Sequence, residues 1–174
     1  MTTNKNTAAF KQIAALINGI KYLGEPTEKH LEKMQRTPKH VAIDWNNILP
    51  VPPPNDSKVT RQELQHISDT TKSVGCDEFD LIYEVDEDPA DLFRPYLKLH
   101  GLKFPEQELK DVHKNSLDPI SLNLKWKYQR PRPAQLAQKF NIEIHVINTT
   151  THHTPAYPSG HAAYAGLLAN MLSD

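Results

Sequence analysis

The chain has 174 residues, a formal net charge of −1 and a single cysteine, Cys76. This length suits one domain with a modest extension, and the near-neutral charge gives no reason to expect nucleic acid or an acidic membrane surface as a partner. One cysteine excludes an intrachain disulfide and a zinc site built from thiolates alone. No apolar run reaches the ~20 residues of a membrane span, and no signal-peptide pattern opens the chain, so we expect a soluble, cytoplasmic protein.

Helical patterns dominate the sequence. Apolar residues make up 38% of the chain and prolines number 14, which favours a small core with long irregular connections. The expected class is therefore mainly α, with proline-rich connections between the helices.

The first 49 residues form an N-terminal helical segment. Apolar residues recur at helical spacing from Thr7 until Gly24 and Pro26 stop the pattern. A second helix is expected over 28–35, resuming through 40–49 after an interruption by Pro38. Residues 50–58 follow as a proline-rich linker, which the prolines hold in an extended and semi-rigid form.

Residues 59–117 form a helical layer of unknown role. Thr60 and Glu63 have the spacing of a capping box, which predicts a helix through about Ser73. The acidic stretch 77–91 lacks the glycine and glutamate positions of a calcium loop, so we interpret it as a solvated helix face. Two short helices are expected over 90–99 and 105–114.

Residues 118–174 carry the candidate site. Asp118 followed by Pro119 is typical of a helix start, and the next prolines, Pro131 and Pro133, predict where that helix ends. A further helix is expected over 134–140. The partly alternating segment 142–147 suits a short extended piece.

A second site element lies at Pro158-Ser159-Gly160-His161, where an extended segment gives way to a helix of small and apolar residues. The first amides of a helix have no internal partner and attract anions. His161 on the first turn could exchange a proton with a bound anion. A capping or loop histidine is the alternative interpretation.

Lys125 and Arg132 are the candidate cations of the same site. A planar guanidinium and a compact ammonium together suit a tetrahedral oxyanion. Their separation of seven residues is nearly two helical turns, and the long Arg132 side chain can curl back past Pro131. The alternative is a solvated surface, since Lys127 and Arg130 show that basic residues collect here.

The combination of these motifs resembles the first two signatures of one superfamily. Lys125, six residues, Arg132-Pro133 and then the 158–161 motif occur in the order found in the type 2 phosphatidic acid phosphatases and vanadium haloperoxidases, which include bacterial acid phosphatases. The resemblance covers residues 118–174. It implies a helical bundle that holds the site inside.

The resemblance also implies a role for each site residue. Lys125 and Arg132 would bind phosphate or vanadate oxygens, and Ser159 with the Gly160 amide would do so from the helix start. His161 would be the general acid that protonates the leaving group. A phosphatase of this kind requires no cofactor, whereas a haloperoxidase uses vanadate.

The third signature of the superfamily is not found after His161. It consists of Ser-Arg, five residues, His, three residues and Asp, and its histidine is the nucleophile or the vanadate ligand. Upstream combinations have the wrong spacing or lack the Asp: Arg36 with His40 and Asp44, Arg61 with His66 and Asp69, and Arg94 with His100 and Phe104. His152 and His153 suit positions on the rim of the site.

The missing signature leaves the expected bundle incomplete at its C-terminus and the apolar side of 162–172 uncovered. An exposed apolar stripe favours association, so a homo-oligomer that covers this helix is one expectation. A truncated enzyme and a degenerate relative are the other two.

Three functions are compatible with these features. The first is an acid phosphatase-like phosphoric monoester hydrolase that takes a phosphate ester or another small oxyanion and is truncated or inactive as it stands. The alternatives are a vanadium-dependent haloperoxidase and a non-catalytic binding or assembly module. We expect this chain to bind phosphate or vanadate weakly with little or no turnover, because the covalent nucleophile is missing.

Overall fold

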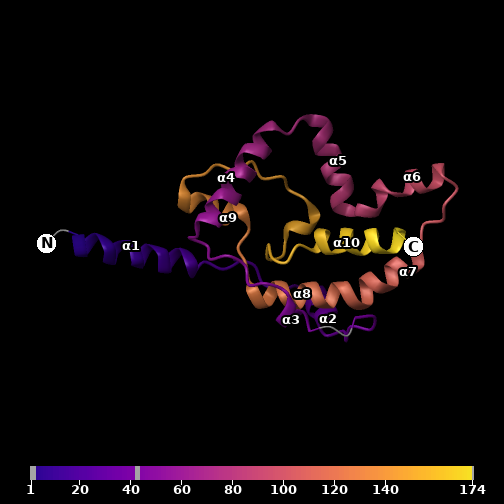
Figure 1. Cartoon of the computed structure of the whole chain (residues 1–174), viewed down its shortest axis with the longest axis horizontal. Coiled ribbons are helices and arrows are strands. Elements are labelled where there is room, and N and C mark those ends of the chain that lie inside the picture. Colours follow the sequence, from indigo (N-terminus) through magenta and orange to yellow (C-terminus); the bar gives the residue numbers. More distant parts are fainter. Residues whose placement is uncertain (1–2, 42–43, 174) are drawn as a thin grey trace.

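A computed structural model describes residues 3–41 and 44–173, and every regular element in these ranges is helical, which confirms the mainly α class. The N-terminal half contains α1 (Thr3–Asn18), α2 (Glu28–Met34), α3 (Trp45–Ile48), α4 (Lys58–Ser73) and α5 (Cys76–Glu87). The central part contains η1 (Pro89–Leu92), α6 (Arg94–Leu99), α7 (Glu106–Val112), η2 (His113–Leu117) and α8 (Asp118–Tyr128). The last part contains α9 (Pro133–Ala137), η3 (Gln138–Phe140), η4 (Thr150–His152) and α10 (Gly160–Leu172) (Figure 1).

Helix α1 ends at Asn18, earlier than the predicted stop at Gly24 and Pro26. The side-chain amide of Asn55 accounts for this early end, because it donates to the Ile17 and Ile20 carbonyls at 3.0 and 2.9 Å. Those carbonyls thereby gain partners outside the helix ladder. Since Asn55 is buried, the proline-rich segment is fixed against the end of α1.

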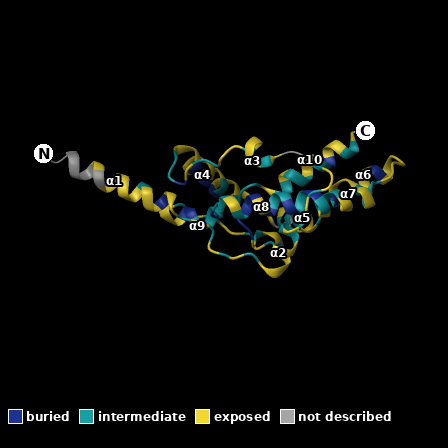
Figure 2. Cartoon of the chain, turned by 90° about the horizontal axis from the view of Figure 1, so that it is seen from below, coloured by how far each residue is buried: buried dark blue, intermediate teal, exposed yellow. Residues whose placement is uncertain are grey.

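The apolar side of α1 is largely exposed, because the helix extends away from the other elements (Figures 1 and 2). Phe10 and Leu16 are 71% and 74% exposed, whereas Ile17 near the end of the helix is buried. The helical pattern in this segment is therefore real, and among the described side chains of α1 the contribution to the core comes from Ile17, near its end.

Helix α4 confirms the predicted helix through Ser73, with a different cap. Its N-cap is Ser57, whose hydroxyl accepts from the Thr60 amide at 3.1 Å. The predicted cap, Thr60, lies inside the first turn and donates its own hydroxyl to the Pro54 carbonyl at 2.8 Å. The capping-box prediction was wrong because this nearby carbonyl takes the Thr60 hydroxyl.

Asp118 does not cap a new helix. Residues 106–128 form one continuous helical run in which α7 passes through the π-helical turn η2 into α8. Pro119 lacks an N–H, so the ladder loses a donor at this change of helical register. The Asp118 carboxylate pairs instead with Lys33 at 2.8 Å, which ties α2 to α8.

The predicted domain boundary at residue 117 therefore falls within this helical run. The second predicted helix was confirmed as α2, whereas the resumption over 40–49 is limited to α3, and residues 42–43 lie outside the described part.

Helix α10 begins after Ser159, as predicted, and its apolar side is covered. Leu168 is fully buried against Ala90 of η1 and Leu109 of α7. Partly buried apolar residues complete this cluster: Phe104, Tyr164, Leu167, Met171 and Leu172. The expectation of an uncovered stripe was wrong, because residues from the 59–117 layer pack onto α10. The homo-oligomer inferred from such a stripe loses its basis.

A second apolar cluster joins α4 to α9. Leu64 packs with Leu136 and Ala137, and all three are buried. Helices α4 and α9 lie beyond the start of α10, whereas α7 lies toward its end (Figure 1). Across the residues that the structure describes, no helix is both long enough and apolar enough to cross a membrane.

Candidate functional site

A cavity of about 530 Å³ lies between the start of α10, the α7–α8 run, α2 and the end of α5. The structure brings three of the five predicted site residues to its wall: Lys125, Gly160 and His161. The other two, Arg132 and Ser159, flank these residues without lining the cavity. Residues of both sequence motifs, Lys125 of the first and Gly160 and His161 of the second, therefore line the same cavity.

The start of α10 has the open amides that the sequence predicts. The Ser159 hydroxyl accepts from the Ala162 amide at 3.2 Å, and the Ser159 carbonyl accepts from the Ala163 amide at 3.2 Å. Within the described residues, the Gly160 and His161 amides make no hydrogen bond. A Cβ placed on Gly160 would meet nothing within 4 Å, so the space beside this residue is open.

Lys125 is buried at the cavity wall, with 7% of its surface exposed. Its Nζ donates to the Pro155 carbonyl at 2.7 Å, and no Asp or Glu in the described ranges forms an ion pair with it. Burial, together with the neighbouring charge of Arg132, lowers the pKa of Lys125 to about 8. The alternative of a solvated surface lysine was therefore wrong.

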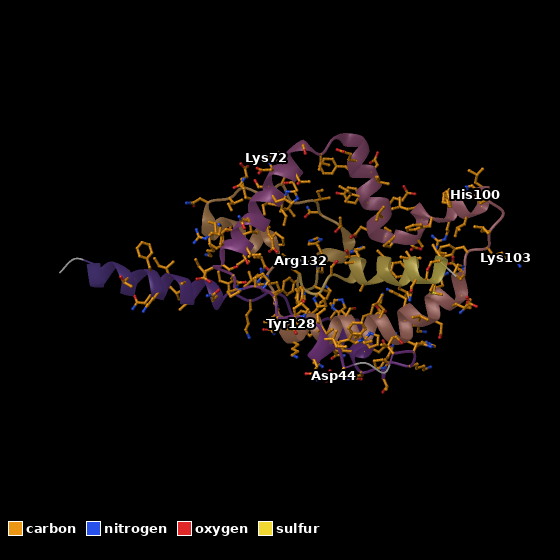
Figure 3. All side chains as sticks on the ribbon, viewed as in Figure 1. Asp44, Lys72, His100, Lys103, Tyr128 and Arg132 are labelled. Carbon is orange, nitrogen blue, oxygen red and sulfur yellow. The ribbon has the colours of Figure 1, made fainter. Side chains whose placement is uncertain are left out.

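Arg132 holds the same loop as Lys125. Its Nε donates to the Thr154 carbonyl at 2.6 Å, and Nη2 donates to the Thr151 carbonyl and to the Thr154 hydroxyl, each at 3.3 Å. Burial lowers the pKa of Arg132, and the nearby Tyr22 and Asp86 oppose that shift. Figure 3 shows Arg132 near the middle of the molecule, beside the start of α10.

The other two cations of this segment are engaged elsewhere. Lys127 donates to the Asn46 side chain at 2.6 Å, and Arg130 donates to the Pro53 carbonyl and to the Thr60 hydroxyl. Lys125 and Arg132 therefore share the 151–155 loop as a hydrogen-bond partner, whereas Lys127 and Arg130 bond to other parts of the chain.

Asp86 is a site residue that was not predicted from the sequence. Its side chain is only 9% exposed, and its Oδ1 lies 3.6 Å from His161 Nε2. The Thr151 amide donates to Asp86 Oδ2 at 3.1 Å, and the Thr151 hydroxyl donates to Oδ1. The acidic stretch was interpreted as a solvated face, which is correct for the exposed Asp80 and Glu84 but wrong for Asp86.

A signal for this burial was present in the sequence. Phe79, Ile82 and Asp86 are spaced three and four residues apart, so Asp86 falls on the same side of α5 as two apolar residues. An acidic residue at such a position is a candidate for a buried partner.

His113 is a second histidine of the cavity wall that was not predicted. Its ring packs edge-on against Tyr164 with centroids 4.9 Å apart, and its Nε2 lies 4.0 Å from Asp118 Oδ1. Burial lowers the pKa of His113, with the nearby Asp118 opposing the shift. The local sequence pattern did not indicate that His113 faces the cavity. The direction of its side chain is set by the π-helical turn η2, which the sequence did not predict.

Of the two histidines predicted for the rim, His153 lines the cavity and His152 does not. The His152 ring is hydrogen bonded to the Thr149 carbonyl and stacks on His153 with centroids 4.1 Å apart.

The upstream arginine and histidine combinations do not assemble a third signature. His40 pairs with Asp111 at 2.7 Å, and the Arg61 guanidinium lies over the Phe140 ring. Arg94 does line the cavity, where three carboxylates engage it. His100 lies at the far end of the molecule, next to the end of α6 (Figure 3).

The wall around Arg94 is acidic and hydrogen bonded. Arg94 Nη2 lies 2.8 Å from Asp88 and 3.2 Å from Glu106. Burial and the charge of Asp88 raise the pKa of Tyr164 to about 12. The cavity therefore has a cationic end at Lys125 and a wall of paired charges toward α6 and α7.

No family model matches this chain, and neither a curated protein nor a solved structure is significantly similar to it. Among the described residues, no group of three His, Cys, Asp or Glu side chains is placed to hold a metal ion.

Chemically, the cationic end is suited to an anion with several oxygens. Lys125 and the open Gly160 and His161 amides are donors of the kind that a tetrahedral oxyanion accepts from, and the Arg132 guanidinium and the Ser159 hydroxyl could join them by turning toward the cavity. His161 lies on the first turn of the same helix and can supply a proton.

Proposed function

We propose that this chain binds phosphate, vanadate or a phosphate ester at an acid phosphatase-like site. Lys125 and Arg132 bind the anion oxygens together with Ser159 and the Gly160 amide, and His161 is the general acid. The observation that carries the proposal is the burial of Lys125 with no ion-pair partner among the described residues, next to a second cation and an open helix start.

Energetics support an anion at this position. A buried charge without a counter-charge is costly, and one carbonyl compensates a lysine ammonium only in part. A bound oxyanion would supply the missing negative charge and accept the remaining ammonium protons. Lys125 and Arg132 would then exchange their bonds to the 151–155 loop for bonds to the anion.

Turnover is a separate question from binding. Within these 174 residues, the third signature is not found: residues 162–174 contain neither Arg nor His, and the upstream combinations have the wrong spacing or lack the Asp. We therefore expect oxyanion binding with little or no hydrolysis. A haloperoxidase and a non-catalytic module would use the same anion-binding residues, so both differ from this proposal only in the chemistry that the bound anion undergoes.

Phosphate-induced stabilisation tests the binding. The thermal unfolding midpoint of the wild type should rise with phosphate concentration, and Lys125→Met should abolish the rise. Lys127→Met is the matched control, since Lys127 lies on the same helix and bonds to Asn46. An equal rise in all three proteins would mean that phosphate binds elsewhere.

Hydrolysis of p-nitrophenyl phosphate tests the chemistry. We expect the wild type to show no turnover above the His161→Ala variant. Robust turnover that His161→Ala abolishes would show that another residue serves as nucleophile, and would contradict the expected lack of hydrolysis.

A further inference from the structure

His161 is held through one particular ring nitrogen. Its Nε2 lies 3.6 Å from Asp86 Oδ1 and 3.3 Å from the Asp86 backbone carbonyl. Within the described residues, Nδ1 of His161 makes no hydrogen bond. The two ring nitrogens are therefore in different environments.

The Asp86 carboxylate is itself held in one orientation. The Thr151 amide donates to Oδ2, and the Thr151 hydroxyl donates to Oδ1. Both oxygens thus accept from Thr151, while Oδ1 also faces the His161 ring. The carboxylate and the carbonyl of Asp86 are acceptors only, so the ring nitrogen facing them must carry the proton.

We propose that Asp86 is the positioning residue of His161: it fixes the proton of the neutral imidazole on Nε2 and leaves Nδ1 as the nitrogen that exchanges a proton with a bound oxyanion. The functional meaning of this proposal rests on the proposed oxyanion site. The tautomer itself does not, and it can be measured without any ligand.

The arrangement also defines the proton balance. As a general acid, His161 would start as the imidazolium, with protons on both nitrogens and the carboxylate of Asp86 nearby to stabilise the charge. The Nδ1–H bond breaks and an O–H bond forms on an oxygen of the bound anion. The ring ends neutral, with its remaining proton on Nε2 and facing Asp86.

Asp86→Asn is the most informative variant, because it replaces one carboxylate oxygen, an acceptor, by an NH₂ donor and changes the shape of the side chain little. Thr151 still supplies an amide N–H where Oδ2 lies, so the asparagine oxygen should occupy that position. The asparagine NH₂ then faces His161 and disfavours a proton on Nε2, whereas the backbone carbonyl of residue 86, 3.3 Å from Nε2, still favours one, so the variant should contain a mixture of the two tautomers. A comparable Asp-to-Asn change misplaces the histidine tautomer in the serine protease triad.

The measurement is nitrogen-15 NMR of the histidine rings, with the His161 signals identified by their loss in His161→Gln. The neutral tautomer is read from the spectrum at the high-pH plateau, where the His161 signals no longer change with pH. We expect Nε2–H in the wild type and a shift toward Nδ1–H in Asp86→Asn. Glu84→Gln, an exposed change on the same helix, should leave the wild-type pattern.

Thr151 provides a second test that keeps Asp86 in place. Thr151→Val removes the hydroxyl that donates to the carboxylate, and should give a mixture of tautomers. Thr151→Ser retains the hydroxyl and should restore Nε2–H. Rescue by serine separates a hydrogen-bond effect from a general loss of packing.

Two results would overturn the proposal: Nδ1–H in the wild type, or Nε2–H unchanged in both Asp86→Asn and Thr151→Val. Phosphate binding forms an independent arm, because Lys125→Met should weaken binding by about tenfold or more and leave the His161 tautomer unchanged. A wild type that shows Nε2–H but no phosphate binding would refute the proposed function alone.

Discussion

At the scale of single residues, the proposed oxyanion site would link anion binding to stability through Lys125. Its pKa is about 8 in the folded chain, against 10.5 for an ordinary lysine, because burial and Arg132 disfavour the charge. The unfolded chain therefore binds more protons between these two values, and stability should rise with pH across that window. The oxyanion affinity should fall over the same window, because Lys125 loses its charge.

Urea unfolding of the wild type and Lys125→Met as a function of pH measures this coupling. At neutral pH the variant should be the more stable protein, by at most about 3 kcal/mol, and the difference should shrink as the pH rises above about 8. Tyr164, with its pKa raised to about 12, acts in the opposite direction above a pH of about 10, so the difference between the two proteins is the informative quantity. A difference that does not depend on pH would contradict the burial of a charged Lys125.

Sequence alone indicated Lys125, Arg132 and His161 as candidate site residues through their types and spacing. It did not indicate Asp86 or His113. Asp86 lies in a stretch where several acidic residues are exposed, and the packing of α5, which the sequence does not show, is what covers its side chain. His113 depends on a π-helical turn, for which the residue pattern gave no signal.

At the scale of helices, the burial of α10 makes a direct prediction. Leu168 is fully buried, so Leu168→Ala should lower the free energy of unfolding by about 2–5 kcal/mol. Leu99, which is 82% exposed on α6, is the matched control, and Leu99→Ala should change stability by less than about 0.5 kcal/mol. Equal losses for the two variants would refute the packing of α10 on η1 and α7.

Asn55 joins the end of α1 to the proline-rich segment. Asn55→Ala removes two donors to buried or partly buried carbonyls and should cost about 1–3 kcal/mol in denaturant unfolding. The matched comparison is Asn18→Ala, which removes a single exposed bond to the Asp56 amide and should cost less. Equal effects of the two changes would argue against the anchoring role of Asn55.

Helix positions were largely predictable from periodicity, prolines and glycines, whereas their boundaries depended on tertiary partners. Ser57 replaced Thr60 as a cap because the Thr60 hydroxyl bonds to the Pro54 carbonyl. The α7–α8 run passes through Asp118 because that carboxylate pairs with Lys33 and does not cap a helix. Partners such as Lys33 are distant in sequence, so local patterns cannot specify them.

At the scale of the whole molecule, the arrangement of the helices determines whether the two motifs can act together. Residues 89–112 cover α10, and the loop 151–155 brings Lys125 and Arg132 to the start of that helix. The sequence predicted Lys125, Arg132 and the start of α10 as parts of the candidate site. It did not predict that residues 89–112 cover α10. That layer could not be inferred from the resemblance, which covers only residues 118–174.

The oxyanion site as a whole is best tested by vanadate binding, measured by isothermal titration calorimetry at neutral pH. Lys125→Met and Arg132→Gln should each weaken binding by about tenfold or more, because each removes a charged donor, while Lys127→Met should bind as the wild type does. Wild-type affinity in both Lys125→Met and Arg132→Gln would show that these two cations do not hold the anion.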